Sequence, residues 1–79
     1  MTEDQKATSL ILELLHAAKG VPVAASRLAA EVKYCGFRND IAGVLRRMVR
    51  DGLAEEMEDG LGILRYTITA DGKEALDEL

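Results

Sequence analysis

The chain has 79 residues and a mass of 8.6 kDa, and 48% of the residues are hydrophobic, so we expect one small domain over residues 1–79 rather than two domains or a disordered chain. One Cys and one His exclude an internal disulfide and a Cys- or His-cluster metal site, and no apolar run approaches the roughly 20 residues of a membrane span. The net charge of −4 is the sum of −1 over residues 1–26, +4 over residues 27–50 and −7 over residues 51–79. The polar N-terminus is unlike a signal peptide, so we expect a soluble cytoplasmic protein without a cofactor.

The first predicted helix spans residues 3–19. Thr2 and Gln5 have the spacing of a capping box, and Gly20 ends the helix. Apolar residues recur at helical spacing at Leu10, Ile11, Leu14, Leu15 and Ala18, with Leu12 beside this stripe. The wide apolar arc leaves two interpretations open: a helix buried deep in a small domain, or a helix that also packs against a second subunit.

A short edge strand is predicted at residues 21–23, where a proline is tolerated. The second helix is predicted over residues 24–34 and ends before Gly36. Its apolar face consists of Leu28, Ala29 and Val32.

The third helix is predicted over residues 38–51, with Asn39 as its N-cap, Phe37 packed against its first turn and Gly52 as its end. Its apolar stripe consists of Ile41, Val44, Leu45 and Met48. The connection of about three residues around Gly36 is the spacing of a helix-turn-helix.

The apolar period then changes from helical to two-fold. Strands are predicted over residues 53–58 and 63–69, and the intervening Asp59-Gly60-Leu61-Gly62 is a hairpin signal. In the second strand Tyr66 is expected to bury its ring and keep its hydroxyl in solvent. Thr69 is expected to cap a last helix over residues 70–78, with Leu76 and Leu79 facing inward.

Three stretches in this order resemble winged helix-turn-helix domains of the MarR/PadR type. They are ASRLAAEVKYCGF, LRRMVRDGLAEE and YTITADGKEAL, the last being similar to the family ending Y-x-L-T-x-x-G, with Tyr66, Ile68, Thr69 and Gly72 in place. Together they cover most of residues 24–76. The resemblance implies an α+β, mostly α fold with a three-helix core, a two-stranded β-hairpin wing and a short C-terminal helix. It also implies sequence-specific binding to double-stranded DNA by a transcriptional regulator.

The helix over residues 38–51 is the expected reader of bases in the major groove. The face opposite its apolar stripe carries Asn39, Ala42, Gly43, Arg46 and Arg50. Arg pairs with guanine and Asn with adenine, and the two small residues let the backbone approach the bases. A mid-helix Gly costs up to about 1 kcal/mol and the Arg46–Arg50 repulsion roughly 0.2–0.5 kcal/mol, so these choices favour a polyanionic or closely packed partner. The alternative is a solvated arginine face with Arg47 paired to Asp51.

Phosphate contacts are expected from residues around this face, namely Ser26, Arg27, Arg38, Arg47 and Arg65. Ser26 and Arg27 lie near the start of the second helix, and helix N-termini favour anions. Lys33 is equally well explained as ordinary solvated surface.

The predicted wing is acidic, which departs from the basic wings of the family. It carries Glu55, Glu56, Glu58 and Asp59 against Arg65 alone. Carboxylates repel a phosphate backbone, so either the first wing strand faces away and Arg65 alone touches DNA, or the wing is not a DNA element. In the second case the acidic residues are expected to meet a basic patch on a protein partner or a second subunit. The acidic wing and the net charge support an alternative function, a winged-helix protein-interaction module or adaptor that does not bind DNA.

The remaining candidates carry little chemistry. Cys35 is more typical of inert packing than of redox or metal sensing, and His16 of a surface or interface residue. The sequence has no phosphate loop and no nucleophile–base arrangement, so we expect no enzymatic activity, and it leaves little room for an effector pocket. A homodimer is expected through the first helix and the last, where Leu76 and Leu79 lie, on half-sites about one helical turn apart.

Overall fold

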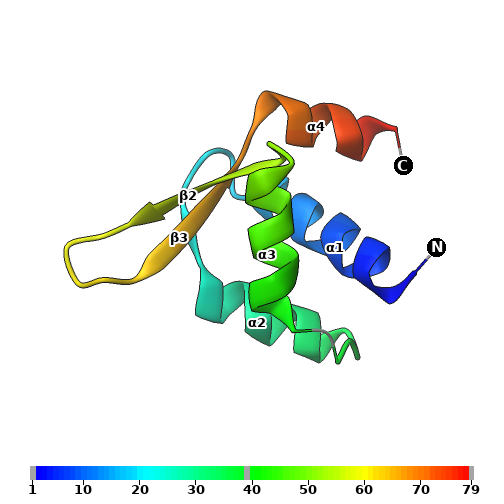
Figure 1. Ribbon diagram of the computed structural model, residues 1–79, viewed down its shortest axis with the longest axis horizontal. Coiled ribbons are helices and arrows are strands. Elements are labelled where there is room, and N and C mark those ends of the chain that lie inside the picture. Colours follow the sequence, from blue (N-terminus) through cyan, green and yellow to red (C-terminus); the bar gives the residue numbers. More distant parts are fainter. Residues whose placement is uncertain (1, 39, 79) are drawn as a thin grey trace.

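The computed structural model describes residues 2–38 and 40–78, and within them it contains four helices and a three-stranded antiparallel sheet (Figure 1). The elements are α1 (Glu3–Ala17), β1 (Val23–Ala24), α2 (Ala25–Tyr34), α3 (Ile41–Arg50), β2 (Ala54–Glu58), β3 (Leu64–Ile68) and α4 (Ala70–Asp77). Each predicted helix and both predicted hairpin strands are present, with ends shifted by up to three residues. The chain is thus an α+β domain that is mostly helical.

The sheet has the order β1-β3-β2, so the predicted short strand is present at the edge and adds a third strand to the β2–β3 hairpin. β1 is displaced from the predicted residues 21–23, because the Val21 N–H donates to the Ala18 carbonyl oxygen, closing the turn after α1 (3.0 Å). Pro22 has no N–H to offer the sheet. Val23 is the first residue to pair, opposite Tyr66.

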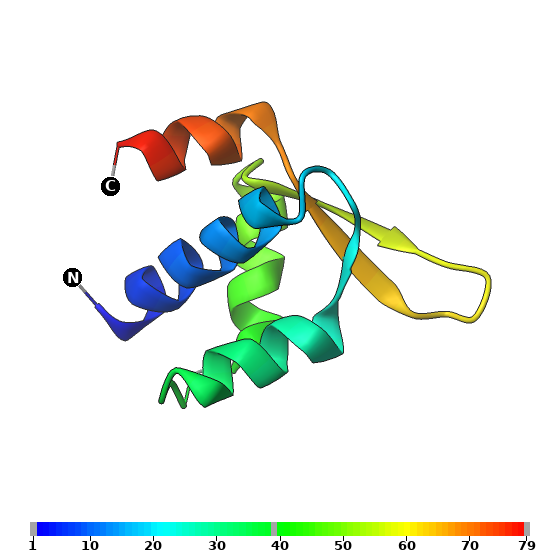
Figure 2. The ribbon, with the colours of Figure 1, turned by 180° about the vertical axis from the view of Figure 1, so that it is seen from behind.

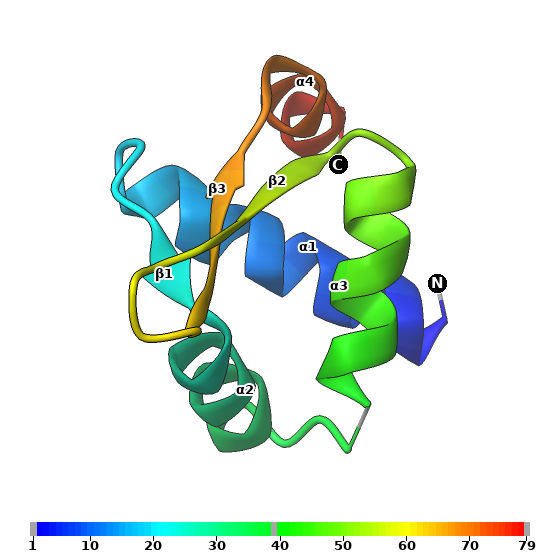
Figure 3. The same ribbon diagram turned by 60° about the vertical axis from the view of Figure 1, so that its left-hand side comes forward.

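α1 lies in the middle of the molecule and packs against α2, α3, α4 and β3. Figure 2 shows it passing between α4 and α2, and Figure 3 shows it behind α3 and the sheet. The core consists of Ala7, Ile11, Leu12, Leu15, Leu28, Val32, Val44, Leu45, Met48, Ala54 and Tyr66, each at most 3% exposed. Packing within one chain therefore accounts for the wide apolar arc of α1. This favours the interpretation that α1 is a helix buried deep in a small domain over one that also packs against a second subunit.

Some predicted core positions were wrong in detail. Leu12, expected beside the apolar stripe of α1, is 1% exposed, whereas Leu10 and Leu14 are only partly buried. The reason is that α1 is covered on several sides, so its buried face is centred nearer Leu12 than a one-sided contact would allow. Ala29 and Ile41, expected in the core, are also only partly buried.

The helix starts are set by side-chain caps. At α1 the predicted capping box is confirmed, because Thr2 Oγ1 accepts from the Gln5 N–H (3.1 Å) and Gln5 Oε1 accepts from the Thr2 N–H (2.8 Å). At α3 the predicted start at residue 38 is wrong, since Asp40 is the N-cap and its carboxylate accepts from the Ala42 N–H (3.2 Å). Asn39, the predicted cap, lies outside the described residues.

The end of α3 and the start of α4 are joined by one polar cluster. Gly52 has φ +78°, the left-handed conformation expected there, and lets the Leu53 N–H donate to the Met48 carbonyl oxygen (2.9 Å). The Thr69 hydroxyl donates to the Gly52 carbonyl oxygen and accepts from the Gly72 N–H (2.9 Å), which confirms Thr69 as the N-cap of α4. This cluster fixes α4 against the first residues after α3.

Candidate nucleic-acid interface

The exposed surface of α3 carries four of the five predicted base-reading residues. Val44, Leu45 and Met48 are each 2% exposed and hold the opposite surface of the helix in the core. We call the outward surface, formed by Ala42, Gly43, Arg46 and Arg50, the arginine face. Ala42, Arg46 and Arg50 are exposed and Gly43 is half-buried. The fifth predicted residue, Asn39, lies outside the described part of the chain.

A hollow borders the arginine face on the side where Asp4 of α1 lies. A shallow depression of about 600 Å³ is lined by Asp4, Asp40, Gly43, Arg46, Arg47 and Arg50. A Cβ atom at Gly43 would lie 3.6 Å from Asp40 Oδ2, an ordinary contact, so packing does not require glycine there. The missing side chain instead keeps the surface open between the arginines.

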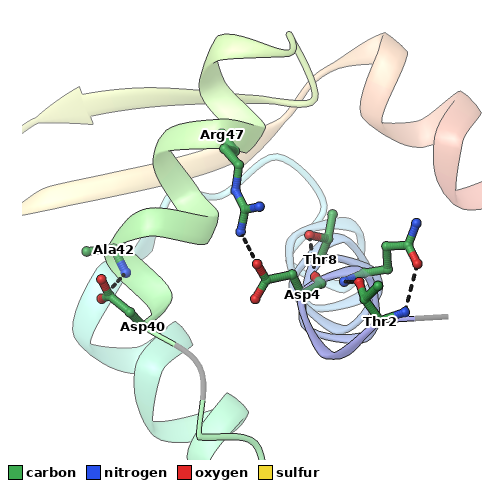
Figure 4. A network of polar contacts seen from close by, with 7 residues as sticks. Thr2, Asp4, Thr8, Asp40, Ala42 and Arg47 are labelled. Atoms are coloured by element: carbon green, nitrogen blue, oxygen red, sulfur yellow. Dashed lines mark hydrogen bonds and ion pairs between the residues drawn. The ribbon is translucent and has the colours of Figure 1, made fainter.

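Arg47 is bound to α1, not to Asp51 as the solvated-surface alternative supposed. Its guanidinium donates to Asp4 Oδ2, and the two side chains point toward one another from α3 and α1 (Figure 4). Asp51 instead accepts from Arg50 Nε (3.3 Å). Both ion pairs are about half exposed or more, and such pairs contribute at most about 1 kcal/mol. A stronger anion can therefore displace either carboxylate.

Three other predicted phosphate contacts lie on the surface near α2. Ser26 and Arg27 are exposed in the first turn of α2, whose N-cap is Ala24 and forms no side-chain cap hydrogen bond. The N–H groups of this helix start are therefore without a side-chain acceptor at the cap position. Arg38 is exposed in the turn before α3.

Arg65 occupies a different setting from the other arginines. It lies on β3, half-buried, and its Nε donates to Asp59 Oδ2 (3.2 Å). The Asp59 carboxylate also accepts from the Leu61 and Ile63 N–H groups, and these two bonds are the main cause of its lowered pKa. The Arg65 guanidinium is thus part of the hairpin turn.

Glu56 and Tyr66 form a pair across β2 and β3. The Tyr66 hydroxyl, expected in solvent, instead donates to Glu56 Oε2 (2.6 Å), and Tyr66 is 3% exposed. Burial first, and then the Glu56 carboxylate, raise the pKa of Tyr66 to about 12, and the charge of Arg46 opposes that shift. Arg46 therefore acts electrostatically on this pair, which ties one acidic residue of β2 to the interior side of the sheet.

The hairpin carries a group of exposed apolar residues that the sequence pattern did not predict. Among the described residues, Met57, Leu61, Ile63 and Leu64 account for four of the six large hydrophobic side chains that are exposed. Leu61 is the most exposed of the four, at 86%. A leucine between two glycines in a hairpin turn was the available signal.

The dimer predicted through α1 and α4 stays a prediction. The described residues of α1 and α4 include no large exposed hydrophobic side chain, so the arc that suggested a dimer surface is occupied within the chain. Leu79 lies outside the described residues, and Leu76 is partly buried against the core.

The remaining candidates do not form a chemical site. Cys35 is exposed at the end of α2, so the expectation of inert packing is wrong, and His16 is a surface residue of α1 as expected. In residues 2–38 and 40–78, no three His, Cys, Asp or Glu side chains are placed to hold a metal ion. Within the same ranges, no helix has the length and apolar character needed to cross a membrane.

No protein-family model, curated protein or solved structure matches the chain. Its function is therefore inferred from its own residues and their geometry.

Proposed function

We propose that the chain is a winged helix-turn-helix protein that binds double-stranded DNA through α3 and regulates transcription. The observation that carries this proposal is the arginine face. Arg46 and Arg50 lie beside a hollow at Gly43, which Arg47, Asp4 and Asp40 also line, on an exposed helix surface that the core does not use. A basic, open helix face suits the major groove, because arginine reads guanine with two hydrogen bonds and small residues let the helix approach.

The order and connection of the elements support the same proposal. α2 and α3 follow one another through a turn in which Gly36 has φ +88°. The β2–β3 hairpin comes next and extends away from the three-helix core (Figure 1). In this arrangement α3 is the recognition helix and the hairpin is the wing.

The proposed DNA contacts fall into two groups, residues that read the bases and residues that bind the phosphates. Asn39, Ala42, Gly43, Arg46 and Arg50 are the proposed base-reading residues. Phosphate contacts are assigned to Ser26, Arg27, Arg38, Arg47 and Arg65. To contact a phosphate, Arg47 has to give up its ion pair with Asp4, and Arg65 its ion pair with Asp59. The free energy of these two phosphate contacts is reduced by the loss of those pairs.

The first strand of the hairpin, β2, is proposed to face away from the DNA, and Arg65 on β3 is the one residue of the hairpin proposed to contact it. Glu56 is bound to Tyr66, and neighbouring residues on a strand point to opposite faces, so Glu55 lies on the other side of β2. Acidic side chains thus occur on both faces of β2, and neither face suits a phosphate backbone. The second candidate function, a protein-interaction module, is favoured by the exposed apolar residues of the hairpin.

The test is fluorescence anisotropy with a random-sequence duplex of about two helical turns, titrated at low and then moderate salt. We expect binding that weakens steeply with salt. On a random-sequence duplex, which offers no specific site to read, Arg46 and Arg50 act through their charge on the nearby phosphates. Arg46→Ala combined with Arg50→Ala should therefore weaken binding and lower the salt slope by up to about 2.

A matched control makes the same change in net charge at positions outside α3. Lys19→Asn with Lys73→Ala removes two exposed positive charges, and Asn is used because Lys19 has φ +53°. This control should bind nearly as well as the unmodified protein. Equal affinity and slope for the arginine variant would refute the assignment of α3, and no binding at low salt would favour the protein-interaction module.

A further inference from the structure

The tip of the β2–β3 hairpin, residues 59–63, is an apolar knob with an acidic edge. Leu61 is 86% exposed, and Ile63 beneath it is 39% exposed. Glu58 is exposed at the base of the tip, where its Oε1 would lie 3.4 Å from a Cβ atom at Gly62. An exposed leucine on a protruding turn is an unfavourable surface unless it is covered by a partner.

The knob is held in a defined position. The Asp59 carboxylate accepts from the Leu61 N–H (2.8 Å) and the Ile63 N–H (3.1 Å), and the Asp59 carbonyl oxygen accepts from the Gly62 N–H (3.0 Å). Arg65 binds the other carboxylate oxygen. The Asp59 N–H also donates to the Ile63 carbonyl oxygen (3.0 Å). Five interactions on one residue keep the turn ordered, so little conformational entropy is lost when Leu61 is buried.

The turn between α2 and α3 contains a depression of matching chemistry. It has a volume of about 310 Å³ and is lined by Ala29, Val32, Lys33, Phe37, Arg38 and Ile41. Four of these residues are apolar. The other two, Lys33 and Arg38, are exposed and positively charged. An apolar floor with a basic rim is the complement of an apolar knob with an acidic edge.

The knob and the depression lie on opposite sides of the molecule. In Figure 1 the hairpin tip is at the far left and the turn between α2 and α3 is at the lower right. A chain therefore cannot insert its own Leu61 into its own depression, and a second copy offers the complementary surface.

We propose that two copies of this chain associate head to tail, with Leu61 of one copy in the depression formed by Val32, Phe37 and Ile41 of the other. In this contact Glu58 faces Lys33 and Arg38 across the rim. The two surfaces are different, so after the first contact one copy still has a free depression and the other still has a free knob. Association of this kind extends into open chains of molecules and does not stop at a dimer. This association does not require DNA binding, although Arg38 takes part in both proposed contacts, and it is tested without DNA.

The test is sedimentation velocity over a concentration series at low salt. For the unmodified protein we expect a mass that rises with concentration beyond twice that of one chain and falls when salt is added. Leu61→Asp removes the knob and Lys33→Glu with Arg38→Glu reverses the rim, and each should weaken association at least tenfold. Val21→Asp, at a residue 65% exposed on another surface, is the matched control and should leave association unchanged.

A mixture of the two defective proteins gives the decisive result. The Leu61→Asp protein keeps its depression and the rim-reversed protein keeps its knob, so one productive contact forms between them. The mixture should sediment with a larger mass than either protein alone. A mixture whose mass is only the average of the two would overturn the proposal. So would an unmodified protein that stays a single chain at the highest concentration, or a dimer insensitive to Leu61→Asp.

Discussion

Gly72→Ala is the substitution for which the structure makes its sharpest prediction about stability. Gly72 is buried in α4, and a Cβ atom there would lie 2.2 Å from the Leu53 carbonyl oxygen and 2.8 Å from Ile68 Cγ1. A comfortable carbon–oxygen contact is about 3.3 Å, so α4 and Leu53 must separate by about 1 Å. The obstacle is backbone, which cannot rotate out of the way as a side chain can.

The size of the effect follows from three contributions. Forcing extra volume into a packed site costs about 1–3 kcal/mol. The Leu53 carbonyl oxygen also accepts from the Thr69 N–H (3.2 Å), and losing this bond costs about 1 kcal/mol. Alanine recovers about 1 kcal/mol of helix propensity. We therefore expect Gly72→Ala to lower the free energy of unfolding by about 2 kcal/mol, which lowers Tm by roughly 8–16 °C in a domain of this size.

Gly43→Ala is the matched control, because it makes the same substitution in another helix. The added Cβ atom meets only Asp40 Oδ2 at 3.6 Å, so the gain in helix propensity is not offset by a clash. We expect an increase in Tm of roughly 4 °C from about 0.5–1 kcal/mol. The chain has no Trp, so unfolding is followed by far-ultraviolet circular dichroism. A Gly72→Ala protein as stable as the unmodified one would refute the close approach of α4 to Leu53.

Three further predictions concern charged and titrating groups. Because the pKa of Tyr66 is raised from about 10 in the unfolded chain to about 12 in the folded one, its contribution to stability is complete below about pH 10 and is lost as pH rises toward 12. Urea unfolding at several alkaline pH values measures this fall in the free energy of unfolding. Glu56→Gln should move the tyrosinate absorbance transition of Tyr66 to lower pH. Asp4→Asn removes the acceptor of Arg47, so the free energy of unfolding should fall by under about 1 kcal/mol. DNA binding in the anisotropy assay should strengthen, because Arg47 no longer has to leave Asp4. Weaker binding would show that Asp4 contributes to the interface. Glu55→Lys should change DNA affinity no more than the same charge change on α4. A marked gain with a steeper salt dependence would place β2 beside the duplex.

The local signals in the sequence predicted the elements well. Thr2 with Gln5, the position of Gly52 and the capping residue Thr69 each act within a few residues of chain, and the structure has all three. The change from helical to two-fold period likewise located the hairpin, because side chains repeat differently in helices and strands. The composition of the arginine face also followed from spacing alone, since an inward stripe on a helix determines which residues point outward.

The tertiary structure decided the contacts between segments distant in the chain. Leu12 is buried because α1 has neighbours on several sides, and no pattern within α1 reveals their number. Arg47 pairs with Asp4, 43 residues away, where the sequence suggested its neighbour Asp51. Tyr66 meets Glu56 because the register of β2 on β3 places them opposite one another.

The sequence by itself determined the helices, the hairpin and the basic outward surface of α3, because caps, turns and periodicity depend on residues a few positions apart. The folded structure decided which charges are already paired and which apolar side chains remain exposed, because both depend on which segments pack together. Leu61 shows the difference. Its place in a turn was readable from the neighbouring glycines, but its 86% exposure and the basic-rimmed depression on the opposite side exist only in the packed molecule.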